Sequence, residues 1–218
     1  MAHPGSWIAF DFDGTLTRSD TLIPFLREVI GVRRLVRSLA MEAPWLAGYA
    51  VGMVTNDVAK QRLLSRTLRG WSKEQLETQG AAFAQDHIPG KLRPETMQRL
   101  CAHREAGNRC VLVTASLTLY TRPWGLAQGF EAVIGSELDF DEHGQATGRL
   151  RGANCIGAEK ERRLRALLGT EPLCAAYGDS RGDREMLAMA EEAYRVGLCG
   201  AKATGRGKSM DMARGRRA

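Results

Sequence analysis

The chain has 218 residues, enough for one compact core with an inserted subdomain or for two small domains. Hydrophobic residues make up 44% of the chain, which excludes a protein that is disordered throughout. The formal net charge is +6, but residues 201–218 carry six basic residues and one acidic residue. The rest is therefore close to neutral, and we expect no nucleic-acid partner.

The first predicted element is a strand at residues 7–12, within the sequence WIAFDFDGTLT. Strand patterns then disappear until about Pro94, and residues 18–92 are predicted to form helices, one of which begins at Ser72 with Gln75 completing a capping box. This stretch is too long for a single crossover between strands. We therefore predict an all-helical cap at 18–92, inserted after the first strand of a core domain made of 1–17 and 93–200.

Strands and helices alternate in the rest of the core. Strands are predicted at 109–115, 130–136, 173–179 and 193–197, and helices at 93–107, 158–169 and 182–192. Residues 136–152 differ, because two alternating segments flank the turn DEHG and predict a β-hairpin. The overall alternation predicts an α/β fold with a parallel sheet and helices on both faces. Residues 201–218 are Gly-rich and basic, and we expect a disordered tail.

Polar residues follow one predicted strand after another, at the edge where open α/β sheets bind their ligands. They are Asp11 and Asp13, then Thr114, Ala115 and Ser116, then Lys160 at a helix start, and finally Asp179 and Asp183. Carboxylates gathered at one edge repel one another unless cations neutralise them. Hard oxygen ligands fit Mg²⁺ best, so the sequence predicts a magnesium site next to Lys160.

The same residues predict a chemistry. A carboxylate beside a metal-bound phosphate can attack phosphorus, which makes Asp11 the candidate nucleophile. A second carboxyl, Asp13, is aimed differently and can act as general acid and base. Thr114, Lys160 and backbone N–H groups would hold the phosphoryl oxygens. The remaining candidates, for phosphate binding or support of the site, are Gly14, Thr15, Ala115, Ser116 and Asp183.

Four motifs in this order resemble those of haloacid dehalogenase (HAD) superfamily phosphatases: DFDGT, Thr114 in VLVTAS, Lys160 in GAEK, and GDSRGD at 178–183. The resemblance implies a Rossmann-like core, Mg²⁺, Asp11 as nucleophile and Asp13 as acid/base. It also implies metal ligation by the Asp11 carboxylate, the Asp13 backbone carbonyl and the Asp179 carboxylate. The helical insertion is similar to the cap of the phosphoserine phosphatase-like subfamily, IB.

The substrate is less well defined. Residues 154–173 and 176–187 resemble a bacterial branch that includes phosphatidylglycerophosphatase C, which favours a lipid phosphate such as phosphatidylglycerol phosphate. The alternatives are a phosphoserine phosphatase, or another small-metabolite phosphatase or phosphotransferase. Asp20 stands where phosphoserine phosphatases usually carry a glutamate, and GDSRGD replaces their GDGAND. A non-catalytic module that binds a phosphorylated ligand is the alternative of another class, although the intact set of Asp11, Asp13, Lys160 and Asp179 speaks against it.

Part of the predicted cap has the character of a membrane-surface segment. Arg33, Arg34 and Arg37 precede an apolar stretch that contains Trp45 and Tyr49, a pattern that indicates peripheral contact with an anionic membrane. The alternative is that Leu35, Leu39 and Leu46 pack inside the cap while the arginines are solvated. Arg66 and Arg69 are further candidates to reach a substrate when the cap closes.

Cysteine usage and the longest apolar window bear on location. The five cysteines form no CxxC pair, which favours the reducing cytoplasm over an oxidising compartment. The apolar window at 39–54 contains Glu42 and Pro44 and is shorter than the roughly 20 residues that a membrane span needs. We therefore expect a cytoplasmic protein, located at the inner face of the membrane if the cap contacts lipid.

Overall fold

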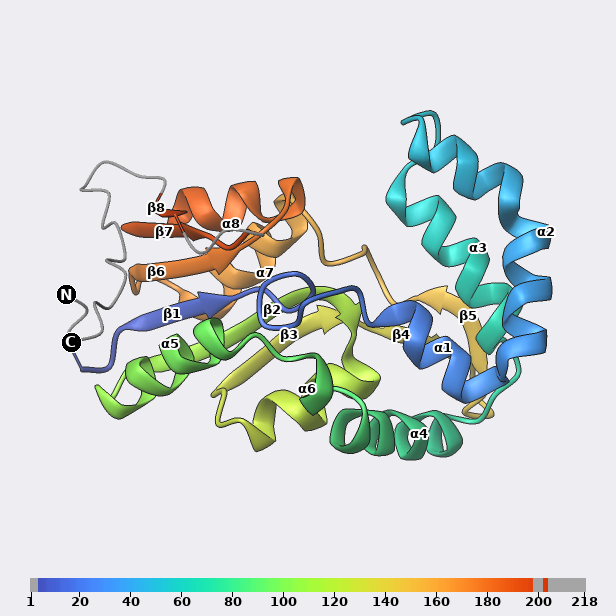
Figure 1. Ribbon diagram of the computed structural model, residues 1–218, viewed down its shortest axis with the longest axis horizontal. Helices are drawn as coiled ribbons and strands as arrows, with labels where there is room; N and C mark the ends of the chain where they lie inside the picture. The colour runs from blue at the N-terminus through green and yellow to red at the C-terminus, as the bar shows by residue number, and fades with distance from the viewer. Residues whose placement is uncertain (1–3, 198–201, 204–218) are drawn as a thin grey trace, which may run out of the picture.

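The computed structural model describes residues 4–197 and 202–203, and its centre is a six-stranded sheet (Figure 1). All neighbouring strands in it are parallel except the last pair, β7 and β8, which is antiparallel. This arrangement confirms the predicted α/β class and its Rossmann-like sheet. The strands in spatial order are β3 (Ala132–Ser136), β2 (Arg109–Leu117), β1 (Trp7–Phe10), β6 (Leu173–Gly178), β7 (Glu192–Arg195) and β8 (Lys202–Ala203).

Helices cover both faces of the sheet, because the strands are apolar on both sides. In β1, Ile8 and Phe10 contribute to a core with the helices of one face, while Trp7 and Ala9 contribute to a second core on the other face. Such continuously buried strands are typical of parallel sheets. The first face carries α5 (Pro94–Glu105) and α6 (Thr118–Ala127), and the second carries α7 (Ala158–Leu168), η2 (Arg181–Asp183) and α8 (Arg184–Met189).

Two expectations near the C-terminus differ from the structure. The predicted helix at 182–192 ends at Met189, because Glu192 already pairs with Ala175 of β6 and this pairing overrides local helix propensity. Within the basic tail, Lys202 and Ala203 pair with β7 as β8, so these two residues are ordered rather than disordered. The rest of the tail, 201 and 204–218, lies outside the described residues.

Four helices and a short 3₁₀ turn occupy the interval between β1 and α5, and α2 and α3 stand apart from the sheet (Figure 1). The buried apolar residues of the four helices, including Phe25, Leu64 and Phe83, belong to the same core as Ile8 and Phe10 of β1. The predicted capping box is confirmed at the start of α4, where Ser72 accepts from the Gln75 N–H and Gln75 accepts from the Ser72 N–H. The elements are α1 (Leu22–Ile30), α2 (Val32–Ala50), α3 (Asn56–Leu68), α4 (Lys73–Asp86) and η1 (Pro89–Lys91).

The predicted hairpin is confirmed as β4 (Leu138–Phe140) and β5 (Ala146–Leu150). It packs on the helical region: the backbone of Ala146 exchanges hydrogen bonds with Gly70 and Trp71. At Gly148, whose φ is +78°, a Cβ atom would lie 2.4 Å from the Cα atom of Ser65 in α3. The contact between Gly148 and Ser65 thus joins the hairpin, which belongs to the predicted core domain, to the helical region. The domain boundaries at 17/18 and 92/93 stay predictions.

The chain enters the helical region through the segment after β1 and leaves it through the segment before α5, and these two segments run side by side. Thr17 and Leu92 form an antiparallel bridge, the Arg18 N–H donates to the Lys91 carbonyl at 2.8 Å, and the Arg93 N–H donates to the Leu16 carbonyl at 2.8 Å. The two connections between the helical region and the rest of the chain therefore lie next to each other, close to the end of β1. No described helix is both long and apolar enough to cross a bilayer.

Candidate active site

Asp11 and Asp13 leave the end of β1 in different directions, as residues two apart in a turn can. The Asp11 N–H still donates to the Tyr177 carbonyl of β6 at 2.9 Å, so its position is fixed by the sheet. Its carboxylate is 5% exposed and accepts a hydrogen bond from the Thr15 hydroxyl at 3.0 Å. The Asp13 carboxylate accepts instead from Thr21 at 2.8 Å and from the Ser116 hydroxyl.

Lys160 neutralises Asp11 from the first turn of α7. Its Nζ atom lies 2.6 Å from Asp11 Oδ1 and 2.5 Å from Asp183 Oδ1, and the residue is 2% exposed. Burial alone would lower the pKa of Lys160, but the Asp11 and Asp183 carboxylates outweigh it and raise that pKa above its usual range. Lys160 is therefore a permanent cation at the floor of the site.

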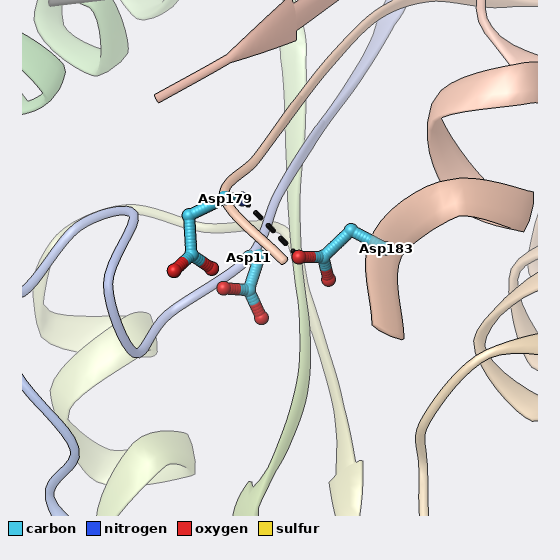
Figure 2. A group of neighbouring side chains, drawn as sticks. All are labelled: Asp11, Asp179 and Asp183. Carbon is cyan, nitrogen blue, oxygen red and sulfur yellow. Dashed lines mark hydrogen bonds between the residues drawn. The ribbon is translucent and has the colours of Figure 1, made fainter. Parts of the chain in front are cut away.

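Three carboxylates converge from two segments of the chain, the end of β1 and the segment that follows β6 (Figure 2). One oxygen atom each of Asp11, Asp179 and Asp183 lies within 4.8 Å of the others. Asp183 Oδ1 is used by Lys160, and Asp183 Oδ2 accepts from the Asp179 N–H at 3.2 Å and from the Ser180 hydroxyl at 2.9 Å. Asp179 forms no ion pair with any described residue, so Asp11 and Asp179 are the carboxylates best placed to bind a cation.

The charge balance of the site fits a divalent cation. Burial raises the pKa of Asp11 to about 7, and burial together with the charge of Asp20 raises the pKa of Asp13 to about 6. Burial and the nearby Asp183 also raise the pKa of Asp179. One lysine compensates only part of this negative charge, and all the donor atoms are hard oxygens, which suit Mg²⁺.

Gly14 allows Asp179 to lie against the turn after β1. Its φ is +80°, and a Cβ atom there would come within 2.1 Å of Asp179 Oδ2. We expect Gly14→Ala to displace the Asp179 carboxylate and to raise the Mg²⁺ concentration for half-maximal activity about tenfold or more. A titration of activity with Mg²⁺ measures this change.

Gly31→Ala is the matched control for this substitution, because Gly31 has a φ of +77° with no atom near its Cβ position. It imposes the same backbone strain away from the site, of roughly 1–3 kcal/mol. An equal effect of both variants on the Mg²⁺ titration would contradict the role of Gly14.

Residues 114–116 end β2 beside Asp13. The buried Thr114 hydroxyl accepts from the Ser116 N–H at 3.0 Å, which fixes the turn, and the Ser116 hydroxyl donates to Asp13. The Ala115 carbonyl accepts a hydrogen bond from Lys60, a residue of α3 in the helical region. The structure thus brings all the residues predicted for the site to one edge of the sheet.

Lys60 is a site residue that the sequence did not single out. Besides Ala115, its ammonium group contacts Asn154 Oδ1 at 2.9 Å, and Asn154 Nδ2 donates to Asn56 Oδ1 at 2.8 Å. Burial lowers the pKa of Lys60 to about 8, although Asp13 and Asp20 oppose this shift. These contacts join α3 to Ala115 near the end of β2 and to Asn154 in the segment before α7.

A cavity of about 400 Å³ opens over the carboxylates. Besides most of the predicted residues it is lined by Arg18, Ser19, Asp20, Arg93, Ile156, Ser180 and Gly182, and most of the lining residues have polar side chains. Arg18 and Arg93 were missed from the sequence. They lie in the two paired segments through which the chain enters and leaves the helical region. Their position at the predicted boundaries of the cap, at 18 and 93, was the feature of the sequence that could have indicated them.

Arg66 and Arg69 do not line this cavity. The Arg66 Nε atom lies 2.6 Å from Glu42 Oε1, within the helical region, and both arginines border a separate cavity of about 300 Å³ with Arg62. Asp20 does line the site cavity, and its Oδ1 atom also accepts from the Leu22 N–H at 3.0 Å at the start of α1.

We expect Lys60→Met to lower kcat/KM about tenfold while the protein stays folded, because a charged hydrogen bond between α3 and the site is lost. Steady-state kinetics on the preferred ester, with circular dichroism for folding, measure this effect. Lys73→Met is the matched control, since Lys73 is exposed at the start of α4. Equal kinetics for wild type and Lys60→Met would show that α3 is not held through this residue.

This chain was compared with models of protein families, with other proteins and with solved structures. The model of the haloacid dehalogenase-like hydrolase family matches residues 8–188. Protein CicA of Caulobacter vibrioides is 37% identical over 198 residues, which cover 90% of this chain and 88% of that protein.

Among solved structures, a Bordetella pertussis Tohama I protein of unknown function has a TM-score of 0.71 at 23% identity, covering 87% of this chain and 89% of that one. A substrate-bound phosphoserine phosphatase has a TM-score of 0.60 at 17% identity, covering 88% and 86%. At these identities the structural matches establish the fold.

Proposed function

We propose that this chain, which belongs to the haloacid dehalogenase-like hydrolase family, is a phosphatase that hydrolyses phosphomonoesters through an aspartyl-phosphate on Asp11. The observation that carries the proposal is the Asp11 carboxylate, fixed by Thr15 and Lys160 at the floor of a polar cavity. Asp13 lies at the same cavity and points away from Lys160 toward Thr21 and Ser116.

The reaction has two steps. A carboxylate oxygen of Asp11 attacks phosphorus and forms the acyl phosphate, while the bond to the ester oxygen breaks and Asp13 donates a proton to the leaving alcohol. Asp13 then removes a proton from water, which attacks phosphorus, releases inorganic phosphate and restores the Asp11 carboxylate. Lys160 and backbone N–H groups near the end of β2 stabilise the phosphoryl oxygens, and the Thr114 hydroxyl would assist them.

We propose Mg²⁺ as the cofactor. The Asp11 and Asp179 carboxylates would hold it, with the Asp13 backbone carbonyl as the family resemblance implies, and Asp183 would support the site by fixing Lys160 and the loop at Ser180. When bound, the ion neutralises phosphoryl charge and orients the phosphate group.

The substrate that we propose first is a lipid phosphate such as phosphatidylglycerol phosphate, whose polar headgroup suits a cavity lined by Arg18, Arg93 and Asp20. The exposed apolar side chains of the helical region, including Val36 and Met53, favour an enzyme that works at the inner face of the membrane. Phosphoserine or another small phosphomonoester is the second candidate. The polar lining, in which Ile156 is the main apolar residue, is the observation that favours it.

A panel of phosphate esters separates these candidates. It contains phosphatidylglycerol phosphate, phosphatidic acid, phosphoserine, sugar phosphates and nucleoside monophosphates, each assayed with Mg²⁺ and with EDTA. We expect phosphate release from one class and loss of release with EDTA. Release that is unchanged by EDTA would contradict the metal, and transfer to an acceptor other than water would indicate a phosphotransferase.

A further inference from the structure

The outward face of α2 carries a continuous row of small apolar side chains. Leu35, Ser38 and Glu42 are buried against the rest of the helical region, so the opposite face points to solvent. The exposed positions on that face recur at intervals of three or four residues, which places them on one stripe about 27 Å long. This apolar stripe consists of Val32, Val36, Ala40, Ala43, Ala47 and Ala50.

Larger apolar side chains extend the stripe. Val51 and Met53, in the turn after α2, are 70% and 85% exposed. Met41 and Trp45 form a second exposed row on α2, where the guanidinium of Arg62 lies 4.2 Å from the Trp45 ring centre. Among the described residues ten large hydrophobic side chains are exposed, and four of them, Val32, Val36, Val51 and Met53, belong to the stripe or directly follow it.

The charges beside the stripe all have one sign. Arg33 and Arg37 flank it on one side, and Arg34 lies in the row of Met41 and Trp45; all three arginines are exposed. Glu42 is the single acidic residue of α2, and it is buried and paired with Arg62 at 2.7 Å and Arg66 at 2.6 Å. The outward face of α2 therefore offers no negative charge.

We propose that α2 docks on the surface of an anionic phospholipid bilayer, with the apolar stripe at the boundary of headgroups and acyl chains and the arginines at lipid phosphates. An amphipathic helix of low net hydrophobicity with a basic flank has the character of an interfacial helix. α2 lies on the side of the helical region away from the central sheet, where a flat surface can reach it (Figure 1).

A second copy of the chain is a poorer occupant. In a two-fold contact through the apolar stripe, the arginines of both helices would face each other, and no exposed carboxylate on either α2 would pair them. Of the two interpretations of this segment from sequence, internal packing is confirmed for Leu35, and membrane contact is the proposal made here. Leu35 packs inside as the alternative required, while a different set of apolar residues faces outward; the side chains of Leu46 and Tyr49 lie outside the described part of the structure.

Co-sedimentation of the full chain with vesicles tests the proposal without any turnover. We expect binding to vesicles of phosphatidylcholine with phosphatidylglycerol, weaker binding in high salt, and little binding to phosphatidylcholine alone. Val36→Glu combined with Met53→Glu should weaken binding to the anionic vesicles at least about tenfold. Leu167→Glu, at an exposed apolar position of α7, is the matched control and should bind like wild type.

Three results would overturn the proposal: no binding of the wild type, equal binding of the double variant, or a dimer in solution that Val36→Glu dissociates. Phosphate release from a water-soluble ester should be the same in all these variants. A failure of lipid binding is therefore distinct from a failure of the proposed reaction, which would appear as lost release in the wild type.

Discussion

Asp11→Asn abolishes turnover, lowering kcat by about three orders of magnitude or more, while the protein keeps its fold. The amide is close to the carboxylate in size and can still accept the Thr15 hydrogen bond, but it cannot attack phosphorus to form an acyl phosphate. Lys160 keeps Asp183 as its partner, so no buried cation is left alone. Phosphate release under saturating substrate, with thermal unfolding alongside, measures both parts of the prediction.

Asp86→Asn is the matched control for this experiment. Asp86 is exposed at the end of α4 and does not line the site cavity, and its replacement makes the same change of charge. We expect wild-type kinetics for it. Turnover of the Asp11→Asn variant near that of the control would remove Asp11 as the nucleophile.

Lys160→Met has the second large effect, on stability. Asp11 and Asp183 are 5% and 1% exposed, and the substitution removes the cation that lies within 2.6 Å of both. Removing one partner of a buried ion pair costs about 3–5 kcal/mol, because the remaining charge is left without compensation. Chemical unfolding in EDTA at neutral pH measures the loss without a contribution from a bound divalent cation.

The pH dependence of that variant gives an independent check. Without Lys160, the folded-state pKa of Asp11, already raised to about 7, rises further, and that of Asp183 is no longer lowered and rises with burial, so the folded state binds more protons. Stability then increases as the pH falls and decreases as the pH rises through the folded-state pKa values. The destabilisation should therefore be smaller at pH 5 than at pH 8.

Two further variants complete the stability test. Lys73→Met, at an exposed lysine, should be close to neutral. Lys160→Met with Asp183→Asn should recover part of the lost stability, since one unpaired carboxylate is removed. A Lys160→Met protein as stable as wild type at neutral pH would contradict the account of a buried, charge-compensated site.

The residues that the sequence predicted share one property: each directly follows a strand pattern or opens a helix. Asp11, Thr114 and Asp179 could be placed because parallel strands end at the same edge, so their position along the chain already gave their position in the fold. Local rules were sufficient for the capping box at Ser72 and for the hairpin around Gly144, since neighbouring residues determine both.

Other residues could not be predicted because tertiary packing places them. Lys60 lies in the middle of α3, and nothing in its neighbourhood in sequence indicates that this turn of the helix meets Ala115 and Asn154. The strand predicted at 193–197 is present as β7, but it already begins at Glu192, because β6 offers that residue a partner, and the helix before it therefore ends at Met189 rather than at 192. Arg66 was a candidate to reach a substrate when the cap closes, and in the structure it pairs with a buried acid, Glu42.

Trapping the phosphorylated enzyme tests the central claim most directly. The protein is mixed with the preferred substrate and Mg²⁺, quenched in acid, reduced with borohydride and analysed by peptide mass spectrometry. Reduction of an aspartyl-phosphate converts that aspartate to homoserine, so the account predicts homoserine at position 11, none at position 13, and none in Asp11→Asn. Homoserine at another position, or none during rapid turnover that leaves the intermediate time to accumulate, would contradict a reaction that passes through Asp11.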